Sequence, residues 1–115
     1  MNESILTTIK KLVGIDETYT QFDADLVIHI NSALIVLFQL GVGPSDGFSI
    51  TGKKETWSEY TDDETLYEMI KTYVYLYVKN IFDPPSSSSV LDSYNKMMTQ
   101  LEWRIAVMTD HLGRP

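Results

Sequence analysis

Four stretches of the chain repeat their apolar residues every three or four positions, the spacing of an α-helix with a buried face. These stretches predict helices over residues 3–13, 23–40, 62–82 and 88–110. Between the second and third helices we expect a short β-hairpin or an extended loop. The pattern therefore predicts a mostly α-helical fold, and the length of the chain suits one domain over residues 1–115.

The first helix has a simple two-sided pattern. Its apolar side is expected to hold Ile5, Leu6, Ile9, Leu12 and Val13, and its polar side Thr7, Thr8, Lys10 and Lys11. Asn2 or Ser4 is expected to cap its beginning, and Gly14 suits its end.

The second helix is apolar around most of its circumference. Asp25, His29, Ser32 and Gln39 leave only a narrow polar stripe. Such a helix is buried on more than one side, either within its own domain or by a neighbouring chain. Its β-branched residues make a buried strand the competing interpretation for residues 27–30, although the length of the pattern favours a helix.

The third helix carries the densest group of tyrosines in the chain. We expect a capping box at Thr61-Asp62-Asp63-Glu64 and a firm end at Pro84 and Pro85. The expected core stripe consists of Leu66, Met69 or Ile70, Tyr73 or Val74, Tyr77 and Ile81. Tyr67, Tyr75, Leu76 and Val78 fall off this stripe, so the far side of the helix is apolar as well.

The fourth helix contains a heptad pattern about three heptads long. The pattern is formed by Leu91, Tyr94, Met98, Leu101, Ile105, Met108 and Leu112. A seam within a helical bundle is favoured over a coiled-coil dimer. Trp103 and Val107 lie off the seam.

Residues 41–60 form the longest non-helical segment. Phe48 and Ile50 alternate with polar residues, as in a strand, and Trp57 is expected to fold back onto the helices. A loop of this length in a small domain is often functional.

Composition narrows the class of protein. Of 115 residues, 43% are apolar and 22% charged, which is ordinary for a globular domain, and the net charge is −7. The nine basic residues are scattered, which argues against tight DNA binding by the monomer. The absence of cysteine removes disulfides and thiolate zinc sites. No apolar run approaches the roughly 20 residues of a membrane span, and we expect no secretory signal.

Candidate chemistry is sparse. His29 has Asp25 and Ser32 one turn to either side, which resembles a catalytic triad in residue type only. His111 lies in the C-terminal tail without a partner in view. Asp25 and His29 fall short of the three or four ligands of a metal site, and helix capping explains Asp62, Asp63 and Glu64. We therefore expect no catalytic residue, no metal, no cofactor and no enzymatic activity.

The aromatic residues off the core stripes have two interpretations. The first is plain core filling. The second is a subunit interface, where Tyr and Trp are enriched, and it names Tyr67, Tyr75, Trp57 and Trp103 as candidates.

Five segments follow one another over nearly the whole chain: ILTTIKKLVGID, FDADLVIHINSALIVLFQLGVG, GFSITGKKETWSEY, MIKTYVYLYVKNIFDPP and LEWRI. The most telling pieces are Trp57, Phe82-Asp83-Pro84-Pro85 and Leu101-Glu102-Trp103-Arg104. In this order and spacing the chain resembles the head–tail connector proteins of tailed bacteriophages and prophages, which act in DNA packaging and head completion.

The resemblance implies a small helical subunit of the virion, located at the head–tail junction and in the host cytoplasm before assembly. Its partners would be further copies of itself in a dodecameric ring, the portal protein above, and a head-closure or tail protein below. DNA would pass through the channel without sequence-specific binding, and no membrane would be involved. The alternative is a bacterial helical adaptor or regulatory module that binds a partner helix through its aromatic face; a small helical enzyme is disfavoured.

Overall fold

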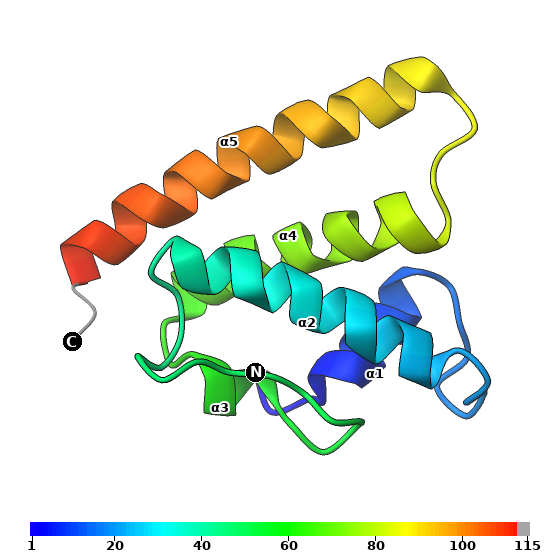
Figure 1. Ribbon diagram of the computed structural model, residues 1–115, viewed down its shortest axis with the longest axis horizontal. Coiled ribbons are helices and arrows are strands. Elements are labelled where there is room, and N and C mark those ends of the chain that lie inside the picture. Colours follow the sequence, from blue (N-terminus) through cyan, green and yellow to red (C-terminus); the bar gives the residue numbers. More distant parts are fainter. Residues whose placement is uncertain (113–115) are drawn as a thin grey trace.

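The computed structural model describes residues 1–112, with the side chains of residues 1–110, and this part forms five α-helices (Figure 1). They are α1 (Ile5–Leu12), α2 (Asp23–Gln39), α3 (Trp57–Tyr60), α4 (Glu64–Phe82) and α5 (Ser88–Leu112). The mostly helical fold is confirmed. The four longer helices begin and end within two residues of the predicted bounds, whereas α3 was not predicted.

The central element is α4, which packs against α2 and α5 and also touches α1. Both α2 and α5 run in the opposite direction to α4, and α5 lies along one edge of the molecule (Figure 1). The molecule is a slab of 37 × 35 × 20 Å. Its hydrophobic core draws on every helix, with Ile5, Ile30, Trp57, Ile70 and Ile105 all fully buried.

The ends of α1 follow the predicted signals, but its faces do not. The Ser4 hydroxyl accepts a hydrogen bond from the Thr7 backbone N–H at 3.2 Å, and Gly14 follows the helix with a φ of 86°. Lys10, expected on the polar side, is only 2% exposed, whereas Leu12, expected in the core, is 44% exposed. The reason is that the loop after α1 folds over Lys10 and supplies polar partners for its ammonium group.

The segment between α2 and α4 is an extended loop with one short helix, α3. The predicted β-hairpin is not confirmed, since residues 40–56 contain no strand and only an isolated bridge joins Thr56 to Ser4. Instead, the Asn31 side chain of α2 binds both backbone groups of Ile50, donating to its carbonyl at 2.9 Å and accepting from its N–H at 2.8 Å. One amide side chain thus replaces the strand partner that Ile50 would otherwise need.

The capping box lies in a different place from the predicted one. It opens α3, where the Thr56 backbone N–H donates to the Glu59 carboxylate at 3.0 Å. At α4 the cap is Asp63, not Thr61, and its carboxylate accepts from the Leu66 N–H at 2.7 Å. The end of α4 at Phe82, directly before the prolines, agrees with the prediction.

The core face of α4 is wider than the predicted stripe. Its buried residues are Leu66, Ile70, Tyr73, Val74, Leu76 and Val78. Leu76 and Val78 were expected off the stripe, and Ile81, expected on it, is exposed. Since α2 and α5 cover two sides of α4, a single stripe could not describe its burial.

The heptad seam of α5 faces the core of the same chain, as the bundle interpretation predicted. Ile105 is fully buried, and Met98, Leu101 and Met108 pack against the core cluster. Among the described side chains of α5, however, only Ile105 and Thr109 are buried. The seam position Leu112 lies outside the described side chains. This helix therefore lies on the surface and leaves most of its circumference uncovered. None of the helices in residues 1–112 is both long and apolar enough to cross a membrane.

Candidate interaction surface

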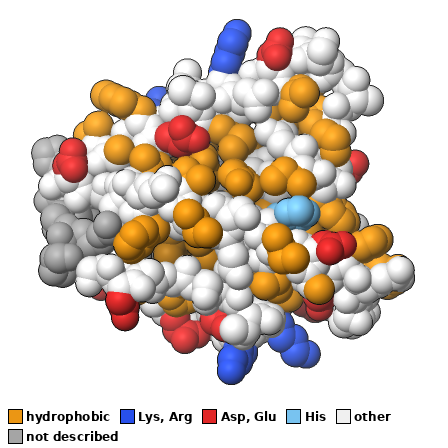
Figure 2. Space-filling model, in the orientation of Figure 1, with side chains coloured by type: hydrophobic (Ala, Val, Ile, Leu, Met, Phe, Trp, Pro, Cys, Tyr) orange, Lys and Arg blue, Asp and Glu red, His pale blue; other side chains and the backbone are white. Residues whose placement is uncertain are grey.

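Three apolar side chains stand out by their exposure in the described part of the chain. Trp103 of α5 is 70% exposed, and Ile28 and Ile35 of α2 are 61% and 60% exposed. Single exposed apolar residues are normal on a protein surface, but each of these three belongs to a defined outer face of a helix. Figure 2 shows hydrophobic side chains gathered along the middle of one broad face, over α2 and between α2 and α5.

The outer α2 face consists of Ile28, Ser32, Ile35 and Gln39, which follow at intervals of one turn. It points away from the buried side of the helix, which includes Ile30 and Leu37. The burial of α2 on more than one side, expected from its apolar circumference, is therefore not achieved within this chain. The outer α2 face is available to another molecule.

The outer α5 face consists of Lys96, Gln100, Trp103 and Val107, which also follow at intervals of one turn. It lies on the side of the helix opposite to Ile105. All four residues are exposed, with Trp103 and Val107 forming its apolar end and Lys96 its charged end. Within residues 1–110, Lys96 takes part in none of the four ion pairs.

The structure places the four predicted interface residues in different environments. Trp57 is fully buried, and its indole N–H donates to the Thr8 hydroxyl at 2.8 Å, so it fills the core of this domain. Tyr67 is half-buried, with its ring centroid 5.5 Å from that of Trp57 and the Lys71 ammonium 4.9 Å away. Tyr75 is half-buried against the core. Trp103 alone has most of its side chain exposed.

Sequence reasoning missed Ile28 and Ile35. The sequence did contain a signal for them. Ile28 and Ile35 lie two turns apart, and so on the same side of a helix that has more apolar residues than one core-facing side requires. Only the packing of α2 against α4 shows which of these residues the core uses.

No hydrogen bond in the described part of the chain joins the side chains of Asp25, His29 and Ser32 to one another. The Ser32 hydroxyl donates to the Ile28 carbonyl at 3.0 Å and is not directed at His29. Across residues 1–110, no group of three or more His, Cys, Asp or Glu side chains is arranged to hold a metal ion. The side chain of His111, the other histidine, lies outside the described residues.

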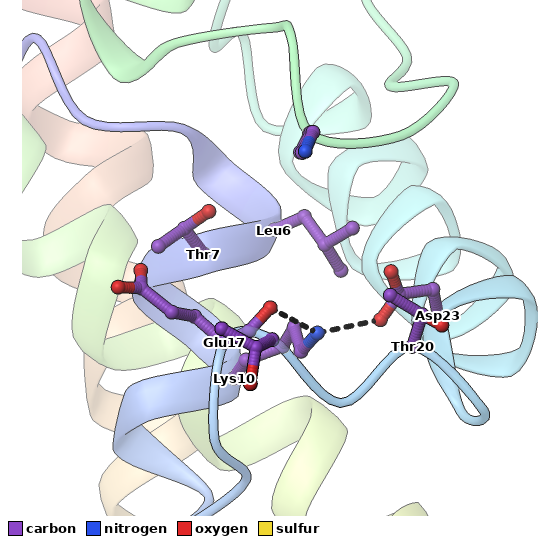
Figure 3. A pocket seen from close by; sticks show the side chains of 8 residues that line it. Leu6, Thr7, Lys10, Glu17, Thr20 and Asp23 are labelled. Carbon is purple, nitrogen blue, oxygen red and sulfur yellow. Dashed lines mark hydrogen bonds and ion pairs between the residues drawn. The ribbon is translucent and has the colours of Figure 1, made fainter.

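A cavity of about 400 Å³ opens beside Lys10, between α1, the loop after it and the start of α2 (Figure 3). The Lys10 ammonium donates to the carbonyls of Glu17 at 3.0 Å and Tyr19 at 2.6 Å, and it pairs with the Asp23 carboxylate at 2.8 Å. These three partners use all three of its N–H donors. Lys10 therefore fixes the loop to α2 and has no donor left for a ligand.

A partly buried hydrogen bond between charged and aromatic side chains joins α4 to α5. The Tyr73 hydroxyl donates to the Glu102 carboxylate at 2.7 Å. Burial, and next the negatively charged Glu102, raise the pKa of the Tyr73 hydroxyl well above its usual value. The phenol therefore stays protonated near neutral pH and acts as a link between α4 and α5.

The comparisons with known proteins agree with a structural role. A family model described as phage connector protein matches residues 5–111, which span the five helices almost to the end of α5. No curated protein and no solved structure matches the chain.

Proposed function

Because the chain belongs to the phage connector protein family, we propose that it is a structural adaptor that joins head to tail in a tailed phage or prophage. The observation that carries this proposal is the family match over residues 5–111.

In this proposal the subunits form a ring, dodecameric in the virion, beneath the portal protein. The ring extends the DNA channel after packaging and presents its lower side to a head-closure or tail protein. A ring requires two different contact faces on each subunit, since each copy touches one neighbour on either side. Exposed apolar residues on two helices, α2 and α5, support this requirement.

Among the aromatic residues, Trp103 is the strongest candidate for a subunit contact because most of its side chain is exposed. Tyr67 and Tyr75 are proposed as lesser contributors, since the domain already covers part of each ring. Tyr75→Glu should then prevent assembly while the monomer remains folded. A loss of the fold itself would assign Tyr75 to the core.

The net charge of −7 supports a channel that does not bind the DNA passing through it. A channel lined by carboxylates repels phosphate and lets DNA pass without adhering. A charge map of the assembled ring tests this part of the proposal, and a basic lumen would contradict it.

The proposed function is tested with the portal protein encoded by the same phage or prophage. The chain is mixed with assembled portal, and the products are followed by native mass spectrometry and negative-stain microscopy. We expect a ring of this chain bound coaxially to one end of the portal. An adaptor of this kind can stay monomeric by itself, so the decisive result is portal binding. Its absence at high concentrations of both proteins would refute the proposal.

A further inference from the structure

We infer that the contact between neighbouring subunits joins the outer α5 face of one copy to the outer α2 face of the next. The partner is thus a second copy of this chain. The inference rests on the proposed function, which supplies the ring, and goes beyond it by naming the two faces that meet.

The first support is the direction of the two faces. The helices α2 and α5 both pack on α4, and each outer face points away from α4. The helix α5 lies at an edge of the slab (Figure 1), whereas the broad face in Figure 2 includes α2. Two unlike apolar faces with different directions suit a head-to-tail contact, in which neither face meets its own copy.

The second support is the matching layout of the faces. On α2, Asp25 lies ten residues before Ile35, and on α5, Lys96 lies eleven residues before Val107. At 1.5 Å per residue, both separations are roughly 15–17 Å along the helix axis. When the two helices lie parallel with Ile35 against Val107, Asp25 therefore comes beside Lys96.

The third support is charge. The only charged residues of α2 are Asp23 and Asp25, and Asp23 already pairs with Lys10. Asp25 and Lys96 are both exposed and belong to none of the ion pairs found in residues 1–110. The parallel arrangement pairs them, whereas an antiparallel arrangement with Ile35 against Val107 places Asp25 beyond the end of α5, far from Lys96.

Crosslinking tests the faces directly, because the chain has no cysteine of its own. Separate Ile35→Cys and Val107→Cys chains are mixed and treated with a short bismaleimide. We expect a crosslinked dimer of the two different chains, in several-fold excess over the dimer from Ile35→Cys with Ser58→Cys, whose position is exposed but off both faces. Ile35→Cys with Lys96→Cys tests the register and should crosslink as weakly as this control.

Two results would overturn the inference. The first is an equal yield from Ile35→Cys with Val107→Cys and from the control pair. The second is a dominant homodimer of Val107→Cys, which would mean that α5 packs against α5. Both results can be measured even when two copies of the chain associate weakly, since the crosslinker captures brief contacts as well as stable ones.

Assembly on the portal gives an independent measurement. Ile35→Asp and Trp103→Asp should each abolish the ring, and their mixture should give dimers but nothing larger, because one intact face remains on each chain. Leu12→Asp, at an exposed apolar position of α1, is the matched control and should still form rings. Circular dichroism checks that each variant is folded.

The outcomes separate this inference from the proposed function. If wild-type chain and both face variants all form rings on the portal, the face assignment is wrong and the connector function stands. If the wild-type chain does not bind portal, the connector function fails. The crosslinking yields then decide the two faces by themselves.

Discussion

At the scale of single residues, Lys10 and Lys11 show how far position outweighs residue type. Lys10 is buried, with three oxygen partners, whereas Lys11 is exposed and pairs with Glu3 at 2.6 Å on the surface. A surface ion pair contributes little to stability, but removing a buried charge leaves its partners without hydrogen bonds.

Lys10→Met should therefore lower the free energy of unfolding by about 2–4 kcal/mol. Three oxygens, those of Glu17, Tyr19 and Asp23, lose a donor. Urea denaturation measures the change, and Lys11→Met is the matched control with little expected effect. Equal effects of the two substitutions would contradict this role of Lys10.

Two glycines of the loop after α2 make a second matched pair. Gly43 and Gly47 both have a positive φ, of 86° and 94°, which disfavours any side chain. A Cβ at Gly43 would also lie 2.8 Å from Cε1 of Tyr60, a buried ring, whereas a Cβ at Gly47 meets nothing within 4 Å.

Gly47→Ala should cost about 1 kcal/mol of stability through backbone strain alone. Gly43→Ala should cost about 1–3 kcal/mol more, because the buried Tyr60 ring must move. Thermal denaturation of the two variants gives the difference. A similar loss of stability in both variants would show that the Tyr60 ring moves aside at little energetic cost.

At the scale of elements, α5 is attached to α4 by its apolar seam and to the rest of the molecule by a few side-chain hydrogen bonds. Besides its apolar seam, the Thr109 hydroxyl donates to the Leu40 carbonyl at 2.7 Å, and Tyr73 donates to Glu102. The second contact makes the attachment sensitive to alkaline pH. The folded state raises the pKa of Tyr73, so it holds a proton that the unfolded chain releases above pH about 10.

The stabilisation from Tyr73 is thus fully present below pH about 10 and is lost as the pH rises above that value. Tyr73→Phe should make the alkaline loss of stability shallower, by up to about 1.4 kcal/mol per pH unit. Urea denaturation at a series of pH values measures the slope. Glu102→Gln, which keeps an acceptor but removes the charge, should give an intermediate slope. An unchanged slope in Tyr73→Phe would contradict this assignment.

At the scale of the whole molecule, acidic residues outnumber basic ones, so that acidic partners are available for many of the lysines. Four of the described lysines, Lys10, Lys11, Lys71 and Lys79, are already held in ion pairs with acidic residues. The remaining described cations are Lys53, Lys54, Lys96 and Arg104. They lie on one loop and on α5, and do not form the continuous basic surface that follows a phosphate backbone.

The chain should accordingly show no retardation of duplex DNA in a gel-shift assay at physiological salt. Non-specific binders have dissociation constants of roughly 10⁻⁴–10⁻⁶ M under such conditions, so the assay should extend through this range. Binding that weakens steeply as salt is added would reveal a basic surface and contradict the proposed passive channel.

The sequence by itself determined the four longer helices. Their apolar periodicity, the Ser4 cap, Gly14 and the prolines after Phe82 are local signals, and local signals act through neighbours in the chain. It also supplied the family resemblance. Trp103 was among its four interface candidates, and the structure leaves that side chain exposed.

Only the tertiary structure decided which apolar residues the core uses. Leu76 and Val78 are buried because α2 and α5 cover two sides of α4, while Ile28 and Ile35 stay exposed because no other element covers the outer α2 face. Likewise, Lys10 is buried because the loop after α1 folds back over it and brings oxygen atoms to its ammonium group. These outcomes depend on how separate segments pack, whereas periodicity reports only that a helix has apolar faces and not which partner covers each one.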